Sequence, residues 1–285
     1  MKKALQAIIQ SLGLLRKNPL ITFPFVLFAL LEGIVLYLLF LAPQEPFAKL
    51  LAPPVARFFG EQSIRYPGHL LVLPQLFYYA KLFLSFLPGM FLSAYFIGLV
   101  ADAKLTRKTS RRYRIKNSFR RFFALLVIWG FGIGVLKLVE ILYKQAVGWN
   151  DHQGYLTTLQ FLVFFLSFWV QALFLYALPL IILARQSLFR SLVGNFRYLW
   201  RLFFPTTVCV FLAALLYLGL YIFEKDLVGL ATRNSPEVIV VILAAGIPLT
   251  LVINLLITTA TTLLFIAEQE TDSKVSLDIG KEASS

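Results

Sequence analysis

The chain has 285 residues, of which 59% are hydrophobic and only 14% are charged, and its formal net charge is +13. Soluble globular domains contain about 45–50% apolar and about 25% charged residues, so this composition excludes an ordinary soluble fold. Several nearly uncharged runs of about 20 residues can cross the ~30 Å hydrocarbon core of a bilayer as helices, and their continuous apolar character argues against the alternating strands of a membrane barrel.

Residues 1–17 begin the chain as a surface element. Their apolar side chains recur at helical spacing, and Arg16-Lys17-Asn18-Pro19 ends the pattern. We expect an amphipathic helix on the membrane, with no cleavable signal peptide, and then a first span at about 20–42. Segment 43–74 contains six prolines. Because proline interrupts helices, we expect short helices on the outer face there rather than a span.

The second and third spans are predicted at about 76–103 and 122–143. Pro88-Gly89 should bend the second span. A basic connector, 104–121, lies between them and has nine Lys or Arg in eighteen residues.

The remaining spans are predicted at about 155–184, 203–223 and 238–267. The last residues, 268–285, hold five acids and little apolar content, so we expect a disordered cytoplasmic tail. The predicted fold class is an all-α integral membrane protein with six transmembrane helices, forming a single membrane domain over 1–267.

The stretch 184–207 predicts the clearest surface helix. Its apolar residues share one side at i, i+3, i+4 spacing: Leu188, Phe189, Leu192, Val193, Phe196, Leu199 and Trp200. We expect Arg190, Ser191, Asn195 and Arg197 on the other side, facing headgroups or a partner. A helix with one apolar and one cationic face lies in the plane of the interface.

Looser versions of this surface element precede the first and third spans. The chain can therefore be divided into three copies of a unit that consists of one surface piece and two spans, beginning near Met1, Lys104 and Ala184. Either a three-fold repeat of helix hairpins or hydropathy alone explains their similarity. Basic residues also predict the orientation, because 19 of the 27 Lys and Arg lie in the N-terminal segment, the second and fourth connectors and the tail. Since positively charged loops stay inside, both termini should be cytoplasmic.

Five polar residues within the spans are candidates for a substrate or proton site: Glu32, Lys137, Glu140, Gln171 and Asn254. An acid near the middle of a span costs a few kcal/mol on insertion scales. Glu32 is therefore either a functional carboxylate facing the bundle interior or a structural acid that is neutral or paired. Gln171 and Asn254 fall on polar stripes, which either hydrogen-bond helix to helix or line a cavity.

Lys137 and Glu140 are spaced to form an ion pair along one helix. The nearby Gly130-x-x-x-Gly134 motif would let another helix approach closely. Lys137 would then point into protein. The alternative, which we favour, is an internal ion pair whose lysine extends toward the outer interface.

Seven basic residues are candidates for contact with anionic lipid headgroups: Arg107, Lys108, Arg111, Arg112, Arg114, Arg190 and Arg197. Each basic residue near an anionic leaflet contributes ~1 kcal/mol of attraction. The alternative is that these charges only orient the chain. We do not expect nucleic acid as a partner, although its phosphates would attract the same charges.

Signals for an enzyme are weak. Both histidines, His69 and His152, are predicted in outer loops, and the sequence has no zinc, phosphate-loop or nucleophile-elbow motif. We therefore predict no metal, cofactor or catalytic residue. An intramembrane enzyme that uses Glu61, His69 and Asp151 is a third hypothesis for function.

Two short motifs carry a family resemblance. They are Ala177-Leu178-Pro179-Leu180-Ile181-Ile182 followed by Ser187, and Leu15-Arg16-Lys17-Asn18-Pro19 followed by Pro24. With the six-span layout, they resemble the six-helix membrane domains of a broad bacterial group, one branch of which is fused to glycerophosphodiester phosphodiesterases. The resemblance implies a bacterial inner-membrane protein that acts as a helper, lipid-interacting or transport-related module. It brings no catalytic residues.

The first functional hypothesis is a non-enzymatic membrane module that binds lipid, especially anionic headgroups, or a partner membrane protein. It rests on the surface helices and the basic connector. The alternative is a small transporter or lipid translocator that uses the polar cluster around Glu32.

Overall fold

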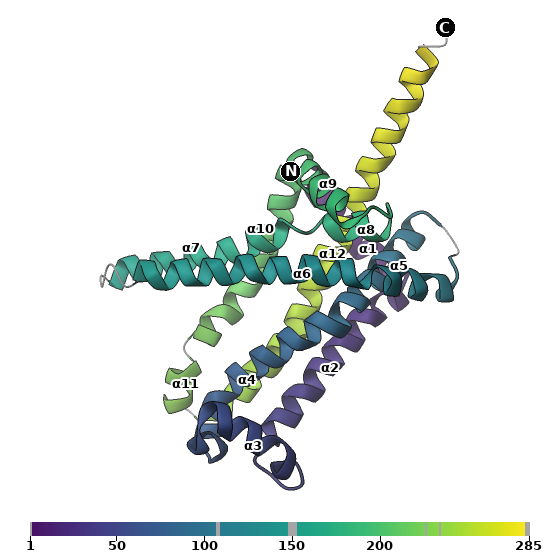
Figure 1. Ribbon diagram of the computed structural model, residues 1–285. Helices are drawn as coiled ribbons and strands as arrows, with labels where there is room; N and C mark the ends of the chain where they lie inside the picture. Colours follow the sequence, from purple (N-terminus) through teal and green to yellow (C-terminus); the bar gives the residue numbers. More distant parts are fainter. Residues whose placement is uncertain (1, 107–108, 148–152, 226, 234, 283–285) are drawn as a thin grey trace. The chain divides into compact units, whose positions relative to one another are not determined.

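The computed structural model is helical, and no strand occurs among the residues it describes, which are 2–106, 109–147, 153–225, 227–233 and 235–282 (Figure 1). Within these ranges six segments are long and apolar enough to cross a membrane: Pro19–Phe40, Gly68–Lys104, Arg111–Gln145, Thr158–Ile182, Phe203–Glu224 and Val238–Asp272. The predicted all-α class with six spans is confirmed.

The chain divides into two compact units. Unit 1 consists of Met1–Thr22, Met90–Ala214 and Leu255–Ser285, and unit 2 consists of Phe23–Gly89 and Leu215–Asn254. The division does not follow the ends of the spans, because α10 (Phe203–Lys225) and α12 (Val238–Glu282) each contribute residues to both units.

Unit 2 is built on α2 (Phe23–Phe40) and α4 (Gly68–Leu84), which lie side by side (Figure 1). Its other elements are α3 (Ala48–Phe59), the 3₁₀ turn η2 (Glu61–Ile64), α11 (Leu227–Arg233) and parts of α10 and α12. The core contains Leu36, Leu70, Leu73, Phe77, Leu227, Ala231, Ile239, Leu243 and Ile247. Because lipid is as apolar as these side chains, close van der Waals packing holds such helices together.

Prolines also occur inside the helices of unit 2. Pro53 and Pro54 lie inside α3, which is one of the short helices predicted for 43–74. Pro74 lies inside α4, because this helix begins at Gly68, earlier than the predicted second span at 76. In α4 the neighbouring Leu73 and Phe77 are buried in the core, and this packing keeps the helix continuous although one backbone hydrogen bond is lost.

The helix is irregular at Pro88-Gly89, where a bend of the second span was predicted. The chain forms a π-helical turn, η3 (Ser85–Gly89), between α4 and α5 (Met90–Lys104). A π turn is a wide turn that accommodates the missing proline N–H. A Cβ atom at Gly89 would lie 3.1 Å from the ring of Phe28, so glycine permits the close approach of α2.

Unit 1 contains α1 (Lys2–Lys17), α5, α6 (Arg111–Val147), α7 (Gln153–Ala172), α8 (Ala177–Ile182), α9 (Leu188–Arg201) and parts of α10 and α12. Helices α6 and α7 lie side by side, as do α8 and α9 (Figure 1). Small residues of α1, Ala4 and Ala7, share a core cluster with Leu199 of α9 and Phe265 of α12.

The surface segments differ from one another. α1 is separated from α2 by the 3₁₀ turn η1 (Pro19–Thr22), and α9 from α10 by Leu202, whereas α6 begins at Arg111 and continues without interruption through its span. The expected separate helix within 104–121 is therefore wrong. The physical reason is that residues 109–147 contain no proline to end the helix.

Two further predictions also differ from the structure. The helix of the predicted span at 155–184 is interrupted, since α7 ends at Ala172 and α8 starts at Ala177. In a continuous helix the ring of Pro179 would clash with the backbone carbonyl four residues earlier. The predicted disordered tail is helical as far as Glu282 within α12. Arg201 contacts Glu268 and Asp272, which are one turn apart on this helix and so are held on one face.

Candidate functional site

Helix α9 presents three different faces. The face packed into unit 1 carries Ser191, Asn195 and Leu199, all buried. A second face carries large exposed apolar side chains: Phe189 (77% exposed), Val193, Phe196 and Trp200 (83% exposed). Arg190 and Arg197 are exposed on the third face, beside these apolar residues. The large side chains of this second face therefore point away from unit 1, whereas Leu199 packs into it.

The expectation that Ser191 and Asn195 face headgroups is wrong. Asn195 is fully buried, and its side-chain Oδ1 accepts a hydrogen bond of 3.0 Å from the backbone N–H of Tyr176. Its Nδ2 donates to the carbonyl oxygen of Leu173. Both partners lie in the non-helical turn between α7 and α8, where the backbone lacks its usual helical partners. Asn195 thus stabilises the break in the fourth span.

Helix α1 is arranged in a similar way to α9. Ala4, Ala7 and Ser11 are buried against unit 1, while Leu5, Ile9 and Leu12 are each more than half exposed. Small residues on the inner face let the helix approach the spans closely. The larger apolar side chains remain available to the surroundings.

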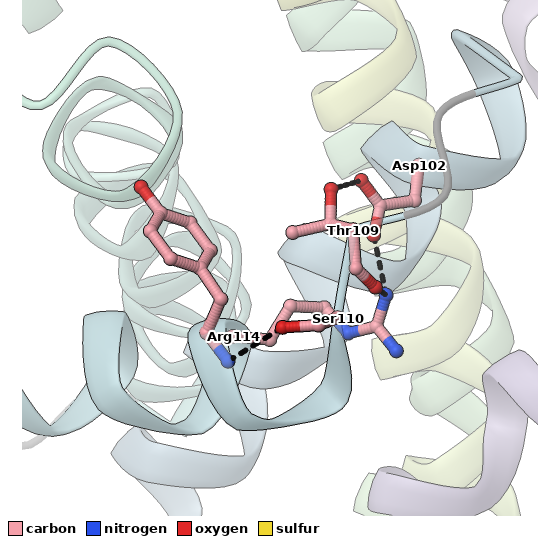
Figure 2. A network of polar contacts seen from close by, with 5 residues as sticks. Asp102, Thr109, Ser110 and Arg114 are labelled. Atoms are coloured by element: carbon pink, nitrogen blue, oxygen red, sulfur yellow. Dashed lines mark hydrogen bonds and ion pairs between the residues drawn. The ribbon is translucent and has the colours of Figure 1, made fainter.

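A polar cavity of about 650 Å³ lies within unit 1, between α5, the start of α6, the turn after α8, α9 and α12. Its charged and amide residues are Asp102, Arg114, Asn117, Arg185, Gln269, Glu270 and Asp272. Figure 2 shows how the Asp102 carboxylate accepts one hydrogen bond from the Thr109 hydroxyl, at 2.7 Å, and another from the Arg114 guanidinium, at 2.5 Å. This network fixes the end of α5 to the start of α6.

The turn that follows α8 is held against α6 by side chains. Asn117 donates to the carbonyl of Ile182 at 3.3 Å, and Arg121 donates to the carbonyl of Arg185 at 3.1 Å. The Arg185 guanidinium lies over the Tyr113 ring, 5.4 Å from its centroid, and donates to the Tyr113 hydroxyl. Arg185 is exposed and lines the cavity, so its charge is available at the mouth.

The seven predicted lipid-contact residues fall into three groups. Arg107 and Lys108 lie outside the described residues. Arg111, Arg112, Arg190 and Arg197 are exposed, as a headgroup contact requires. Arg114 differs, because its guanidinium forms the internal ion pair with Asp102 and is mostly buried.

A second ion pair joins the C-terminal end of α9 to α12. Arg201 donates to both carboxylate oxygens of Asp272, at 2.8 and 2.9 Å. This hydrogen-bonded carboxylate raises the pKa of the Arg201 guanidinium, and burial, with a smaller contribution from Asp272, raises the pKa of the Tyr198 phenol. Both groups therefore keep their protons at neutral pH, and the pair ties the end of α9 to α12.

The five predicted intramembrane polar residues belong to different units. Lys137, Glu140 and Gln171 are in unit 1, and Glu32 and Asn254 are in unit 2. Lys137 Nζ lies 2.6 Å from Glu140 Oε2, as the spacing predicted. Both side chains are substantially exposed, which fits the favoured ion pair rather than a Lys137 that points into protein.

In the described structure, no second helix packs closely against the glycines near Lys137. A Cβ atom placed at Gly130 or Gly134 would meet nothing within 4 Å. Lys144 also contacts Glu140, at 2.9 Å, so both lysines pair with this acid along α6. Gln171 and Asn254 are exposed.

Glu32 has a partner that the sequence pattern did not single out. Its side chain is 4% exposed, and its Oε1 lies 3.7 Å from Nζ of Lys81 on α4. The signal was present, because Lys81 lies within the predicted second span, 76–103, where a lysine is as unusual as an acid. The paired-acid interpretation of Glu32 matches this geometry.

A cavity of about 420 Å³ adjoins this ion pair within unit 2. Lys81 lines it from α4, together with Phe77 and Tyr78, and Tyr217 and Glu224 line it from α10. The Tyr217 hydroxyl donates to Oε2 of Glu224 at 2.7 Å. Neither Tyr217 nor Glu224 was among the predicted site residues.

The enzyme hypothesis loses one of its residues. His69, predicted in a loop, lies in the first turn of α4, is buried, and its Nε2 is 2.8 Å from the carbonyl oxygen of Leu39. Asp151 and His152 lie outside the described residues. In the part of the chain that the structure describes, no three acidic, histidine or cysteine side chains are grouped as metal ligands.

Comparisons with protein-family models, with curated proteins and with solved structures found no match to this chain.

Proposed function

We propose that this protein is a non-enzymatic, multi-pass module of the bacterial inner membrane that binds phospholipids through their headgroups at its cytoplasmic face. The observation that carries the proposal is the outer surface of α9. Its exposed aromatic stripe, with Phe189 and Trp200, suits the boundary between acyl chains and headgroups, and the adjacent Arg190 and Arg197 suit lipid phosphates.

The orientation in this proposal follows from charge. The basic start of α6, the arginines of α9 and both termini share one side of the six spans in the predicted topology, and positive charge favours the cytoplasmic side. The cytoplasmic leaflet is the more anionic one, so the same surface that orients the chain would also bind its lipids.

The cavity of unit 1 is the proposed site for one such headgroup. It is large enough for a phosphate with a small substituent, and Arg185 offers an exposed guanidinium at its mouth. Among the described ion pairs, Asp102 pairs with Arg114 and Asp272 pairs with Arg201. Arg185 is therefore the lining guanidinium proposed to contact the anionic group.

We also propose that α1, the start of α6 and α9 are three copies of one unit, of which the copy in α6 continues into its span without a break. Each contains a buried serine, Ser11 in α1, Ser118 in α6 and Ser191 in α9, with larger apolar residues exposed nearby. A three-fold repeat would place three interfacial surfaces around the cytoplasmic side, consistent with the bacterial six-helix group that the sequence resembles. Such surfaces would equally suit a partner membrane protein.

A second candidate function is a small transporter or lipid translocator. It is favoured by one observation, the buried ion pair of Glu32 and Lys81 beside the cavity of unit 2. Ionised residues buried within spans commonly mark the path of an ion or substrate.

Lipid binding is tested by native mass spectrometry of the protein released from detergent with phosphatidylglycerol. We expect Arg190→Gln/Arg197→Gln to lower the affinity for this anionic lipid about tenfold or more, since each charge contributes ~1 kcal/mol. The matched control is Lys137→Gln/Lys144→Gln, which removes two exposed charges near the C-terminal end of α6, away from its basic start. This variant should leave lipid retention unchanged. Equal retention by all three proteins would overturn the proposal.

A further inference from the structure

The described charged groups around the cavity of unit 2 do not balance in charge. Among the described residues, Lys81 is the ammonium beside two carboxylates: it lies near Glu32 of α2 and lines the cavity together with Glu224 of α10. If both carboxylates are ionised, these three groups carry one negative charge in excess. An uncompensated charge away from water is costly, so a proton or another cation is required to balance it.

The contacts of Lys81 do not hold its ammonium tightly against either carboxylate, so another cation can balance the second carboxylate. Its Nζ is 3.7 Å from Oε1 of Glu32, which is longer than a good hydrogen bond, and lies 5.5 Å from the centroid of the Phe77 ring. Glu224 instead takes its short hydrogen bond from the neutral Tyr217 hydroxyl, which lies two turns earlier on the same face of α10. Glu224 is therefore the carboxylate with no close ammonium among its described contacts.

The cavity has room beside Glu224 and walls that suit an organic cation. Gly246 of α12 faces the carboxylate, since a Cβ atom there would lie 3.7 Å from Oε1 of Glu224 and 3.0 Å from a methyl group of Leu220. The rings of Phe77, Tyr78 and Tyr217 line the same space. Aromatic faces combined with one carboxylate are the chemistry that recognises ammonium groups.

We infer that this cavity binds an ammonium-type organic cation in exchange for a proton, with Glu224 as the anionic contact. In the empty site the proton resides on Glu224, and the Lys81 ammonium balances Glu32. When the cation binds, the Glu224 carboxylic acid releases its proton to solvent and the carboxylate faces the bound ammonium. One positive charge replaces another, so the site stays balanced. The inference does not depend on lipid binding by unit 1.

The titratable groups that surround Glu224 come from three elements. They are Lys81 and Tyr78 on α4, Tyr217 on α10, and Glu32 on α2 behind Lys81. Tyr217 donates to the carboxylate in its ionised form and equally to the carbonyl oxygen of its protonated form. This hydrogen bond therefore holds Glu224 in place through the exchange.

The experiment is isothermal titration calorimetry of the full chain in uncharged detergent. The probes are methylammonium and tetramethylammonium chloride, with sodium chloride at equal ionic strength as the reference. Repeating each titration in two buffers of different ionisation enthalpy counts the protons released. We expect saturable binding of at least one ammonium probe with close to one proton released per cation. No saturable binding, or binding without proton release, would overturn the inference.

Three variants sharpen the test. Glu224→Gln keeps an acceptor for Tyr217 and should weaken cation binding at least tenfold, whereas Glu140→Gln, an exposed acid of unit 1, should not change it. Lys81→Gln removes the competing internal cation and should strengthen binding several-fold. If a Lys81→Gln protein that is still folded bound the ammonium probes more weakly than the unmodified chain, the inference would be wrong. Should Glu224→Gln not fold, the proton count of the unmodified protein still decides.

Discussion

Replacing Asn195 by leucine is expected to lower the free energy of unfolding by about 2–5 kcal/mol. The change removes both hydrogen bonds to the turn between α7 and α8 and leaves the N–H of Tyr176 and the carbonyl of Leu173 without their partner. Each buried backbone group that loses its partner costs about 1–3 kcal/mol. Leucine has a similar size, so the loss reports the hydrogen bonds rather than a cavity.

Unfolding by a denaturing detergent, followed by circular dichroism, measures this difference. Arg197→Leu on the same helix is the matched control, because Arg197 is exposed, and its effect should stay within about 0.5 kcal/mol. An Asn195→Leu protein as stable as the unmodified chain would show that the turn is satisfied in another way.

Lys81→Gln is expected to destabilise the protein by about 3–5 kcal/mol. The variant leaves the Glu32 carboxylate buried without its cation, and breaking one side of a buried pair has this magnitude. Glu32→Gln/Lys81→Gln should regain most of the loss, because two neutral amides carry no charge to compensate. The same unfolding assay applied to both single variants and the double variant gives the interaction energy directly.

The exposed pair on α6 is the control for this cycle. Lys137→Gln breaks an ion pair whose side chains are 46% and 41% exposed, and surface pairs contribute about 0–1 kcal/mol. If the Lys81 cycle gave an interaction energy as small as that of Lys137 and Glu140, the pair in unit 2 would have no structural importance.

The spans were predictable because hydropathy and length alone identify them. The six apolar runs predicted from the sequence match the six candidate spans of the structure. The irregularity at Pro88-Gly89 follows from one proline. Pro74 shows the limit of the same argument, since packing of its neighbours Leu73 and Phe77 maintains the helix.

The faces of the surface helices were less predictable. The apolar and polar sides of α9 are visible in the sequence, but which of them contacts the protein depends on tertiary packing. Asn195 is polar and yet buried, because it satisfies a turn that Pro179 creates in another span. A pattern along one helix carries no information about such a partner.

The candidate sites depend even more on long-range contacts. Glu32 was identifiable by its position in a span, but its partner Lys81 and the neighbouring Glu224 are far apart in sequence. Conversely, Arg114 looks like its basic neighbours in the sequence, and only the fold shows that Asp102 neutralises it.

The central claim is that α9 lies at the membrane interface with its aromatic side toward lipid, and the depth of Trp200 tests it most directly. In a Trp129→Phe/Trp149→Phe/Trp169→Phe variant, Trp200 is the remaining tryptophan. After reconstitution with lipids brominated at different acyl positions, we predict that bromines nearest the headgroup quench its fluorescence most strongly. Quenching by no brominated lipid, or strongest quenching by bromines near the acyl-chain ends, would contradict this account.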